Sequence, residues 1–215
     1  MPTSSHFRAA ASAENDPLEI ALLRADKLMR DILEATSATS YVTALTGPNN
    51  FRKEINPEYK ANRKDVVKPI HLDAVKTFLT VEWNAVTTDG YEADDLLGMN
   101  QTEDSIICSI DKDLLMIPGK HYNFVKGEFL EVNELEGLQS FYRSALVGDK
   151  SDNIFGVTGI GKVKAAKLIN PLDNEKDMYN TVCKLYNDPD RLEMNLDCLW
   201  IWRSMYTRWS NRFGF

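Results

Sequence analysis

The sequence predicts an α/β protein, with a central and mostly parallel sheet flanked by helices and a helical C-terminal region. Short β-branched strands alternate with helical patterns over the first part of the chain, and strand signals end near residue 138. The chain has 215 residues, 43% of them hydrophobic and 27% charged, which suffices for a substantial core. We therefore predict two regions, an α/β core at 1–138 and a helical region at 139–215.

The first elements are a helix, a strand and a basic loop. Asp16 is predicted to cap a helix with Pro17 at its first position, and apolar residues recur at helical spacing over 18–35. Residues 40–45 are β-branched and aromatic before a Thr-Gly-Pro turn, which is typical of a strand. Residues 49–68 are polar and basic, so we expect an exposed loop or a loop with a short helix.

The next elements alternate between helix and strand. Apolar spacing predicts a helix over 72–79 and a short helix over 92–99. Strands are predicted over 84–88 and over the buried-type run SIICSI at 105–110. Strands separated by helices favour parallel pairing.

The remaining pattern is a hairpin followed by helices. Residues 121–132 predict a hairpin that turns near Lys126 and Gly127. From Gln139 onward the signal is helical, interrupted by a glycine-rich run at 156–161.

Several classes of protein are disfavoured. No apolar run approaches the roughly 18–20 residues of a membrane span, and the N-terminus shows no secretory signal. Cys108, Cys183 and Cys198 are odd in number and widely spaced, which favours reduced thiols over disulfides or a zinc site. We expect a cytoplasmic monomer.

Acidic residues are concentrated in one stretch. The net charge is -7, and residues 89–113 hold eight acids and one base. Such a cluster is either a solvated surface or a metal site. A negative net charge by itself disfavours binding to nucleic acid. If divalent cations bind in this cluster, they reduce its effective negative charge, and the net charge is then compatible with DNA binding.

Carboxylates follow two predicted strands. Asp111 and Asp113 follow the strand at 105–110, and Glu92, Asp94 and Asp95 follow the earlier one. Functional residues of open α/β sheets gather beyond the carboxyl ends of the strands. Crowded carboxylates repel each other unless cations intervene, and Mg²⁺ prefers oxygen ligands. This pattern favours two-metal phosphodiester cleavage, with a solvated acidic face as the alternative.

A third acidic group lies further along the chain. Asp149 and Asp152 are three residues apart in GDKSDN. Asp, Ser and Asn are also typical of turns and helix caps, so a purely structural role remains the alternative.

Two segments carry candidate phosphate contacts. In residues 51–64, basic side chains interleave with aromatic ones, which suits a nucleic-acid strand, although a solvated loop is the alternative. The candidates there are Arg52, Lys53, Tyr59, Lys60, Arg63 and Lys64.

The second segment is glycine-rich. Its glycines would let the backbone approach a phosphate, and a helix would follow with its N-terminal amides. Gly159 and Gly161 are expected to hold conformations that a Cβ would strain. A plain helix-hairpin turn is the alternative. The candidate DNA contacts are Gly156, Gly159, Gly161, Lys162, Lys164 and Lys167.

Four motifs in one order carry a family resemblance. They are YKANR from Tyr59, DGYEADD from Asp89, SIDKD from Ser109 and GDKSDNIFGVTGIG from Gly148. Together they resemble the 5′→3′ exonuclease and flap endonuclease family, in the form carried by bacteriophages and by the nuclease part of bacterial DNA polymerase I. The resemblance extends from about residue 7 to about residue 203.

The resemblance implies roles for these residues. It implies a PIN-like nuclease core with an arch-like basic segment at 49–68, where Lys60 and Arg63 contact the scissile phosphate. It implies a helix-hairpin-helix element at 156–161 that holds duplex DNA and a K⁺ ion. It implies two Mg²⁺ or Mn²⁺ ions, with ligands among Glu92, Asp94, Asp95, Asp111, Asp113, Asp149 and Asp152.

The implied activity is metal-dependent 5′→3′ exonuclease or 5′ flap endonuclease cleavage of DNA with 5′ ends, flaps or single-strand/duplex junctions. The family normally opens with a buried strand bearing an Asp, whereas this sequence begins MPTSSHF. A second acid, expected after the strand at 40–45, is replaced by Thr46-Gly-Pro-Asn. The alternatives are therefore a truncated or impaired relative that binds junctions without cutting, and a longer protein that starts upstream of Met1.

Overall fold

The computed structural model describes residues 16–64 and 66–212, which fall into two compact units. Of these residues, the first unit contains 16–50, 66–112 and 119–131. The second contains 51–64, 113–118 and 132–212.

The first unit is α/β, as predicted, and its strands are short. Its elements are α2 (Leu18–Thr36), β1 (Ala44–Leu45), α4 (Leu72–Glu82), β2 (Val86–Thr87), α5 (Ala93–Met99), β3 (Ile106–Cys108), β4 (Gly119–Asn123) and β5 (Glu128–Val132). Strand β1 pairs with β2 and β3 pairs with β4, both in parallel. Strand β5 lies beside β4, in agreement with the predicted hairpin. The predicted parallel pairing is therefore confirmed, as two separate short ladders in the described chain.

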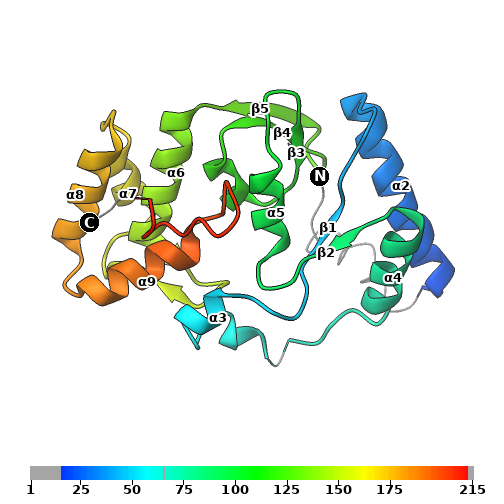
Figure 1. The fold of residues 1–215 in the computed structure, drawn as a ribbon, viewed down its shortest axis with the longest axis horizontal. Coiled ribbons are helices and arrows are strands. Elements are labelled where there is room, and N and C mark those ends of the chain that lie inside the picture. The colour runs from blue at the N-terminus through cyan, green and yellow to red at the C-terminus, as the bar shows by residue number, and fades with distance from the viewer. Residues whose placement is uncertain (1–15, 65, 213–215) are drawn as a thin grey trace. The chain divides into compact units, whose positions relative to one another are not determined.

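Helices α2 and α4 form one core of the first unit. Ala21, Ala25 and Met29 recur every fourth residue on α2 and are fully or almost fully buried. They belong to one apolar cluster with Val75 and Leu79 of α4, and Figure 1 shows the two helices side by side. The apolar spacing that predicts both helices is thus the face that they bury against each other.

The start of α2 differs from the prediction. The helix begins at Leu18, so Pro17 precedes it, and no side chain caps its amides. Asp16 pairs with Arg24 at 2.7 Å instead.

The second unit is mainly helical. Its elements are α3 (Arg52–Ile55), η1 (Ala61–Arg63), η2 (Lys112–Met116), α6 (Glu134–Val147), β6 (Gly148–Asp149), β7 (Ile154–Phe155), α7 (Lys162–Ile169), α8 (Glu175–Leu185) and α9 (Pro189–Leu199). Helix α6 contacts α7, α8 and α9, and Figure 1 shows these helices grouped around it. Strands β6 and β7 form an antiparallel hairpin that the helical pattern beyond Gln139 does not predict.

Helix α6 begins earlier than the sequence predicts. Asn133 accepts a hydrogen bond from the Glu136 amide, and the Glu136 carboxylate accepts one from the Asn133 amide. This reciprocal capping box starts the helix at Glu134. The predicted region boundary at 138 therefore falls inside α6. The functional division into 1–138 and 139–215 stays a prediction. The two compact units are defined by packing and have other boundaries.

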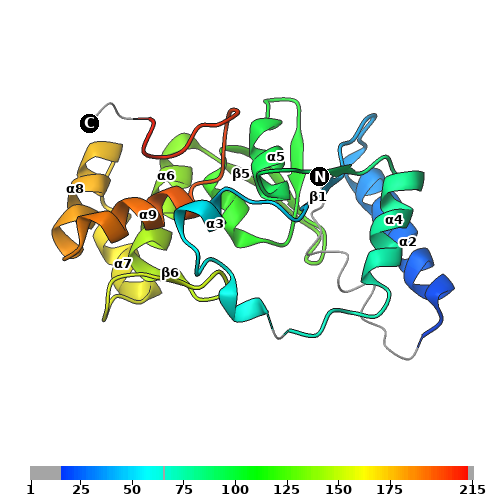
Figure 2. The same ribbon diagram turned by 60° about the horizontal axis from the view of Figure 1, so that its bottom comes forward.

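Residues 51–64 pack in the second unit because of Arg52. Its Nε donates to the Cys198 carbonyl and its Nη2 to the Trp200 carbonyl, both at 2.8 Å. Figure 2 shows α3 lying beside α9.

Across residues 16–64 and 66–212, no helix is long and apolar enough to span a membrane.

Candidate metal and phosphate site

Two predicted acids of the first unit meet at the start of α5. Glu92 is the N-cap of this helix, and its amide donates to Asp95 Oδ2 at 2.9 Å in a capping box. Asp95 is completely buried and Glu92 is 8% exposed. The capping box therefore brings these two acids together at the start of α5.

Residues after β1 support the acids after β2. Asn49 Nδ2 donates to Asp89 Oδ1 at 2.7 Å, and Asn50 Nδ2 donates to Glu92 Oε1 at 2.8 Å. The ends of two paired parallel strands thus meet at one edge, as predicted. Sequence reasoning missed Asn49 and Asn50, and their place directly after the Thr-Gly-Pro turn was the available signal.

The other predicted acids lie on different elements. Asp94 lies in the first turn of α5. Asp111 follows β3, and its amide donates to Ser109 Oγ at 2.9 Å. Asp113 lies in η2, which belongs to the second unit from that residue on. Within the part of the chain that the structure describes, no three His, Cys, Asp or Glu side chains form a ready set of metal ligands.

Three predicted residues of the second unit meet around Asp152. Arg63 Nη2 pairs with Asp152 Oδ1, and Lys60 Nζ lies 3.4 Å from Oδ2. The hydroxyl of Tyr59 donates to Oδ2 at 2.8 Å, and the Lys60 ammonium lies 4.8 Å from the Tyr59 ring centroid. Residues some 90 positions apart in sequence therefore form one charged cluster.

Backbone contacts fix this cluster. The Lys60 amide donates to the Asp152 carbonyl at 2.9 Å, and Arg63 Nε donates to the Ser151 carbonyl at 2.9 Å. Asn62 Nδ2 donates to the Lys150 carbonyl at 2.8 Å. The YKANR segment is thus docked on the β6–β7 turn.

Asp149 has a structural role in that turn. Its Oδ1 accepts hydrogen bonds from the amide and the hydroxyl of Ser151, each at 2.7 Å. Asp149 therefore stabilises the turn, and metal binding by this residue stays a prediction.

The predicted DNA contacts of residues 51–64 divide into buried and exposed. Arg52 is 2% exposed and Tyr59 is 3% exposed, so both serve packing in this structure. Lys53 and Lys64 are exposed to solvent.

The glycine-rich turn has two conformationally different glycines. Gly159 has φ +77°, where a side chain is strained, as predicted. Gly161 has φ −95° with open space at its Cβ position, so the expectation of strain there is wrong. It is instead the N-cap of α7. A Cβ on Gly156 would lie 2.3 Å from the Leu146 carbonyl oxygen, so this glycine allows close packing on α6.

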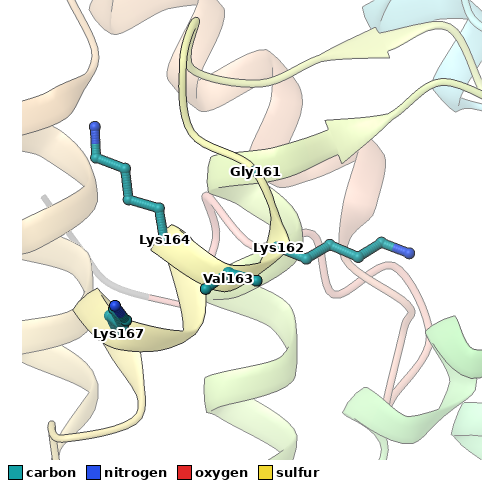
Figure 3. Close-up of a pocket in the computed structure, with 5 residues that line it drawn as sticks. All are labelled: Gly161, Lys162, Val163, Lys164 and Lys167. Carbon is teal, nitrogen blue, oxygen red and sulfur yellow. The ribbon is translucent and has the colours of Figure 1, made fainter.

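The three lysines of α7 surround a shallow pocket that Gly161 and Val163 also line. Figure 3 shows Lys162 extending to the right of the helix, Lys164 to the upper left and Lys167 toward the viewer. The last two are three residues apart and so share a face. All three lysines are exposed.

Comparison with known proteins identifies the family. The profile of the 5′-3′ exonuclease N-terminal, resolvase-like domain matches residues 6–144. A 5′-3′ exonuclease of Buchnera aphidicola (strain Sg) is 30% identical over 164 residues, which cover 68% of this chain and 57% of that protein. The exonuclease of Escherichia phage T7 is 30% identical over 189 residues, which cover 77% of this chain and 62% of that protein.

A solved relative shares the fold. The bacteriophage T5 flap endonuclease, in a complex with DNA and metal ions, has a TM-score of 0.66 at 18% identity, covering 93% of this chain and 86% of that one. The chain spans about three fifths of the length of the Buchnera and phage T7 exonucleases. On the profile match and these similarities, the chain belongs to the 5′-3′ exonuclease family and carries its N-terminal resolvase-like domain.

Proposed function

We propose that this protein hydrolyses DNA phosphodiester bonds as a metal-dependent 5′→3′ exonuclease or structure-specific 5′ flap endonuclease. The observation that carries the proposal is the cluster of Lys60, Arg63 and Asp152, which joins two of the four family motifs. Family membership and the names of the relatives support the same reaction.

The donor set fits hard divalent cations. The proposed ligands are Glu92, Asp94, Asp95, Asp111, Asp113, Asp149 and Asp152, and all offer carboxylate oxygens. Mg²⁺ commonly binds one or two carboxylates and completes its shell with water and substrate phosphate, so a ready set of three ligands is not required. Bound Mg²⁺ or Mn²⁺ would lower the pKa of water and neutralise charge on the phosphate. Two ions are proposed for the DNA-bound protein.

Lys60 and Arg63 are proposed to stabilise the phosphate that is cleaved. Both side chains are cationic and their positions are set by Asp152 and by the backbone of the β6–β7 turn. Charges that are fixed before the substrate arrives stabilise a developing charge without reorganisation. Asp152 therefore acts as a positioning residue for both cations in this structure.

We propose that exposed lysines contact the DNA backbone, namely Lys53, Lys64 and the three lysines of α7. Phosphate contacts carry no base information, so recognition would depend on DNA structure, such as a 5′ end, flap or junction. A K⁺ ion at the 156–161 turn belongs to the same proposal and would assist backbone binding there.

Cleavage of defined substrates tests the function. Purified protein is incubated with a 5′-flap duplex, a nicked duplex and a blunt duplex, in Mg²⁺, Mn²⁺ or a chelator. We expect metal-dependent loss of nucleotides or flaps from 5′ ends and none with chelator. Intact flap and nicked substrates in both metals would contradict the proposal.

A second candidate is a DNA-junction-binding module that does not cleave. The absence of a three-ligand metal set among the described residues favours it. Calorimetric titration of the junction-bound protein with Mg²⁺ and Mn²⁺ distinguishes the two candidates. Two bound ions per chain favour the enzyme, whereas junction binding without metal binding favours the module.

A further inference from the structure

The segment after α9 has an unusual composition. Residues 199–212 hold three of the four tryptophans of the chain, one tyrosine and three arginines, and no acid. This segment is locally cationic in a chain with a net charge of -7. It lies beyond residue 144, where the family profile ends.

Two aromatic rings of this segment form a row with Phe51, which lies far earlier in the chain. Phe51 stacks on Trp202 with centroids 4.6 Å apart and an interplanar angle of 17°. Tyr206 meets Trp202 edge-on at 5.7 Å. Phe51 and Trp202 are 6% and 3% exposed, so the outer ring of Tyr206 rests on a buried support.

The turn that carries Tyr206 presents this ring to solvent. The Thr207 amide donates to the Ser204 carbonyl at 3.2 Å, which places Met205 and Tyr206 at the centre of a β-turn. Tyr206 has φ +59°, a conformation that this turn position normally reserves for Gly or Asn. A bulky residue there is strained, and such strain concentrates at functional sites. Despite the strain, Tyr206 is 75% exposed and Met205 is 51% exposed.

One arginine beside the row is available for a ligand. Arg203 pairs with Glu134 and Arg212 pairs with Glu175, each at 3.0 Å. The guanidinium of Arg208 instead lies 5.3 Å from the Phe51 ring centroid and remains partly exposed. Its charge can therefore reach a phosphate near the exposed ring.

We propose that Tyr206, supported by Trp202 and flanked by Arg208, stacks on an unpaired base of single-stranded DNA. Exposed aromatic rings beside cationic groups bind single strands because every base offers a flat face and every nucleotide a phosphate. A duplex hides its base faces, so this platform selects the single-stranded part of a substrate. The inference rests on the proposed function insofar as DNA is the ligand.

Equilibrium binding to single strands tests the platform. The probe is fluorescein-labelled oligothymidylate of about 12 nucleotides, followed by anisotropy with the full chain. Tyr206→Gly removes the ring and suits the positive φ, so folding is preserved. We expect it to weaken binding by about 5- to 150-fold, the effect of one lost base stack. Tyr206→Phe keeps the ring and is expected to bind like the parent.

Two further variants separate stacking from general effects. Phe129→Ala removes another exposed aromatic ring, on β5, and is expected to leave the affinity unchanged. Arg208→Gln is expected to reduce the slope of log affinity against log salt by about 0.7, the contribution of one single-strand phosphate. Affinity for a blunt duplex should be the same in all four variants.

The outcomes separate this inference from the proposed function. Unchanged oligothymidylate affinity in Tyr206→Gly, with an unchanged melting temperature, overturns the platform even if the protein cleaves DNA. Ring-dependent binding by a protein that never cleaves supports the platform and contradicts the nuclease. If sedimentation shows that the parent is a dimer and Tyr206→Gly a monomer, the ring belongs to an interface between copies and the proposal is overturned.

Discussion

At the scale of single residues, the same side-chain type has different roles according to its neighbours. Asp95 is buried and accepts a backbone amide, whereas Asp152 pairs with Lys60 and Arg63. Asp111 follows β3, where its backbone amide donates to Ser109 Oγ. It is a suitable proposed metal ligand to replace, because this contact is made by the backbone and does not need the carboxylate.

Replacing Asp111 tests the proposed metal chemistry. Asp111→Ala should reduce cleavage by at least about 100-fold, because a lost ligand removes charge stabilisation that the transition state needs. DNA affinity should stay near that of the parent, since the ions serve the transition state more than substrate binding. Asp104→Ala, an exposed acid of the same acidic stretch, is the control. Equal cleavage by both variants would remove Asp111 from the site.

Gly159 and Gly161 form a matched pair for the backbone argument. Gly159→Ala should lower the free energy of unfolding by about 1–2 kcal/mol, because φ +77° strains an L side chain. Gly161→Ala should change it little, because its φ of −95° is ordinary and its Cβ position is open. Urea unfolding of both variants measures the difference. A larger loss in Gly161→Ala than in Gly159→Ala would refute this assignment.

At the scale of elements, α7 and the β6–β7 hairpin concentrate the candidate DNA-binding groups of the second unit. The hairpin turn holds Lys60 and Arg63 through its backbone carbonyls and Asp152. Helix α7 carries Lys164 and Lys167 three residues apart, so both leave the helix from neighbouring positions. We therefore expect one duplex to contact both.

The lysine pair should act through phosphates. The double variant Lys164→Ala and Lys167→Ala should weaken duplex binding for all sequences alike. It should also reduce the salt slope by about 1.8, which corresponds to two phosphate contacts. Lys176→Ala, on the exposed surface of α8, is the control with an unchanged slope. A slope that stays the same in the double variant would mean that these lysines only face solvent.

At the scale of the whole molecule, contacts distant in sequence decide which segments pack together. Arg52 is the main example, since both of its donors reach carbonyls that lie about 150 residues later. Its guanidinium also lies 4.6 Å from the Phe51 ring centroid. Arg52 thus holds the start of residues 51–64 in the second unit, and the YKANR contacts with the β6–β7 turn hold the rest.

Loss of Arg52 should affect stability before binding. Arg52→Met should reduce the free energy of unfolding by about 3 kcal/mol, because two buried carbonyls lose a charged donor. The neighbouring Lys53→Met, at an exposed position, should change it by less than about 0.5 kcal/mol. Guanidinium unfolding measures both. If Arg52→Met kept the parental stability and lost only DNA affinity, the residue would be a DNA contact after all.

Local patterns were sufficient to predict much of the fold. The four-residue spacing on α2, the parallel pairing of β1 with β2 and the β4–β5 hairpin all follow from periodicity and turn residues. The meeting of acids and supporting amides after β1 and β2 follows from parallel topology. These features depend on interactions among near neighbours or on general rules of sheet geometry, so they can be predicted from the sequence.

Other features depended on partners far along the chain. The hairpin β6–β7 closes through a close approach of Gly148 and Gly156, which no local pattern reports. The ion pairs of Asp152 depend on Lys60 and Arg63, which lie some 90 residues earlier in the chain.

The sequence by itself determined the α/β class, the order of the elements and the four motifs that define the family, because these reside in local spacing and residue type. Only the tertiary structure decided that Arg52 and Tyr59 are packing residues, that Gly161 is unstrained, and that Tyr206 is an exposed ring on a buried aromatic support. The physical reason is that burial and ion pairing depend on which distant segments exclude water together. That outcome is a property of the packed chain and not of any window along it.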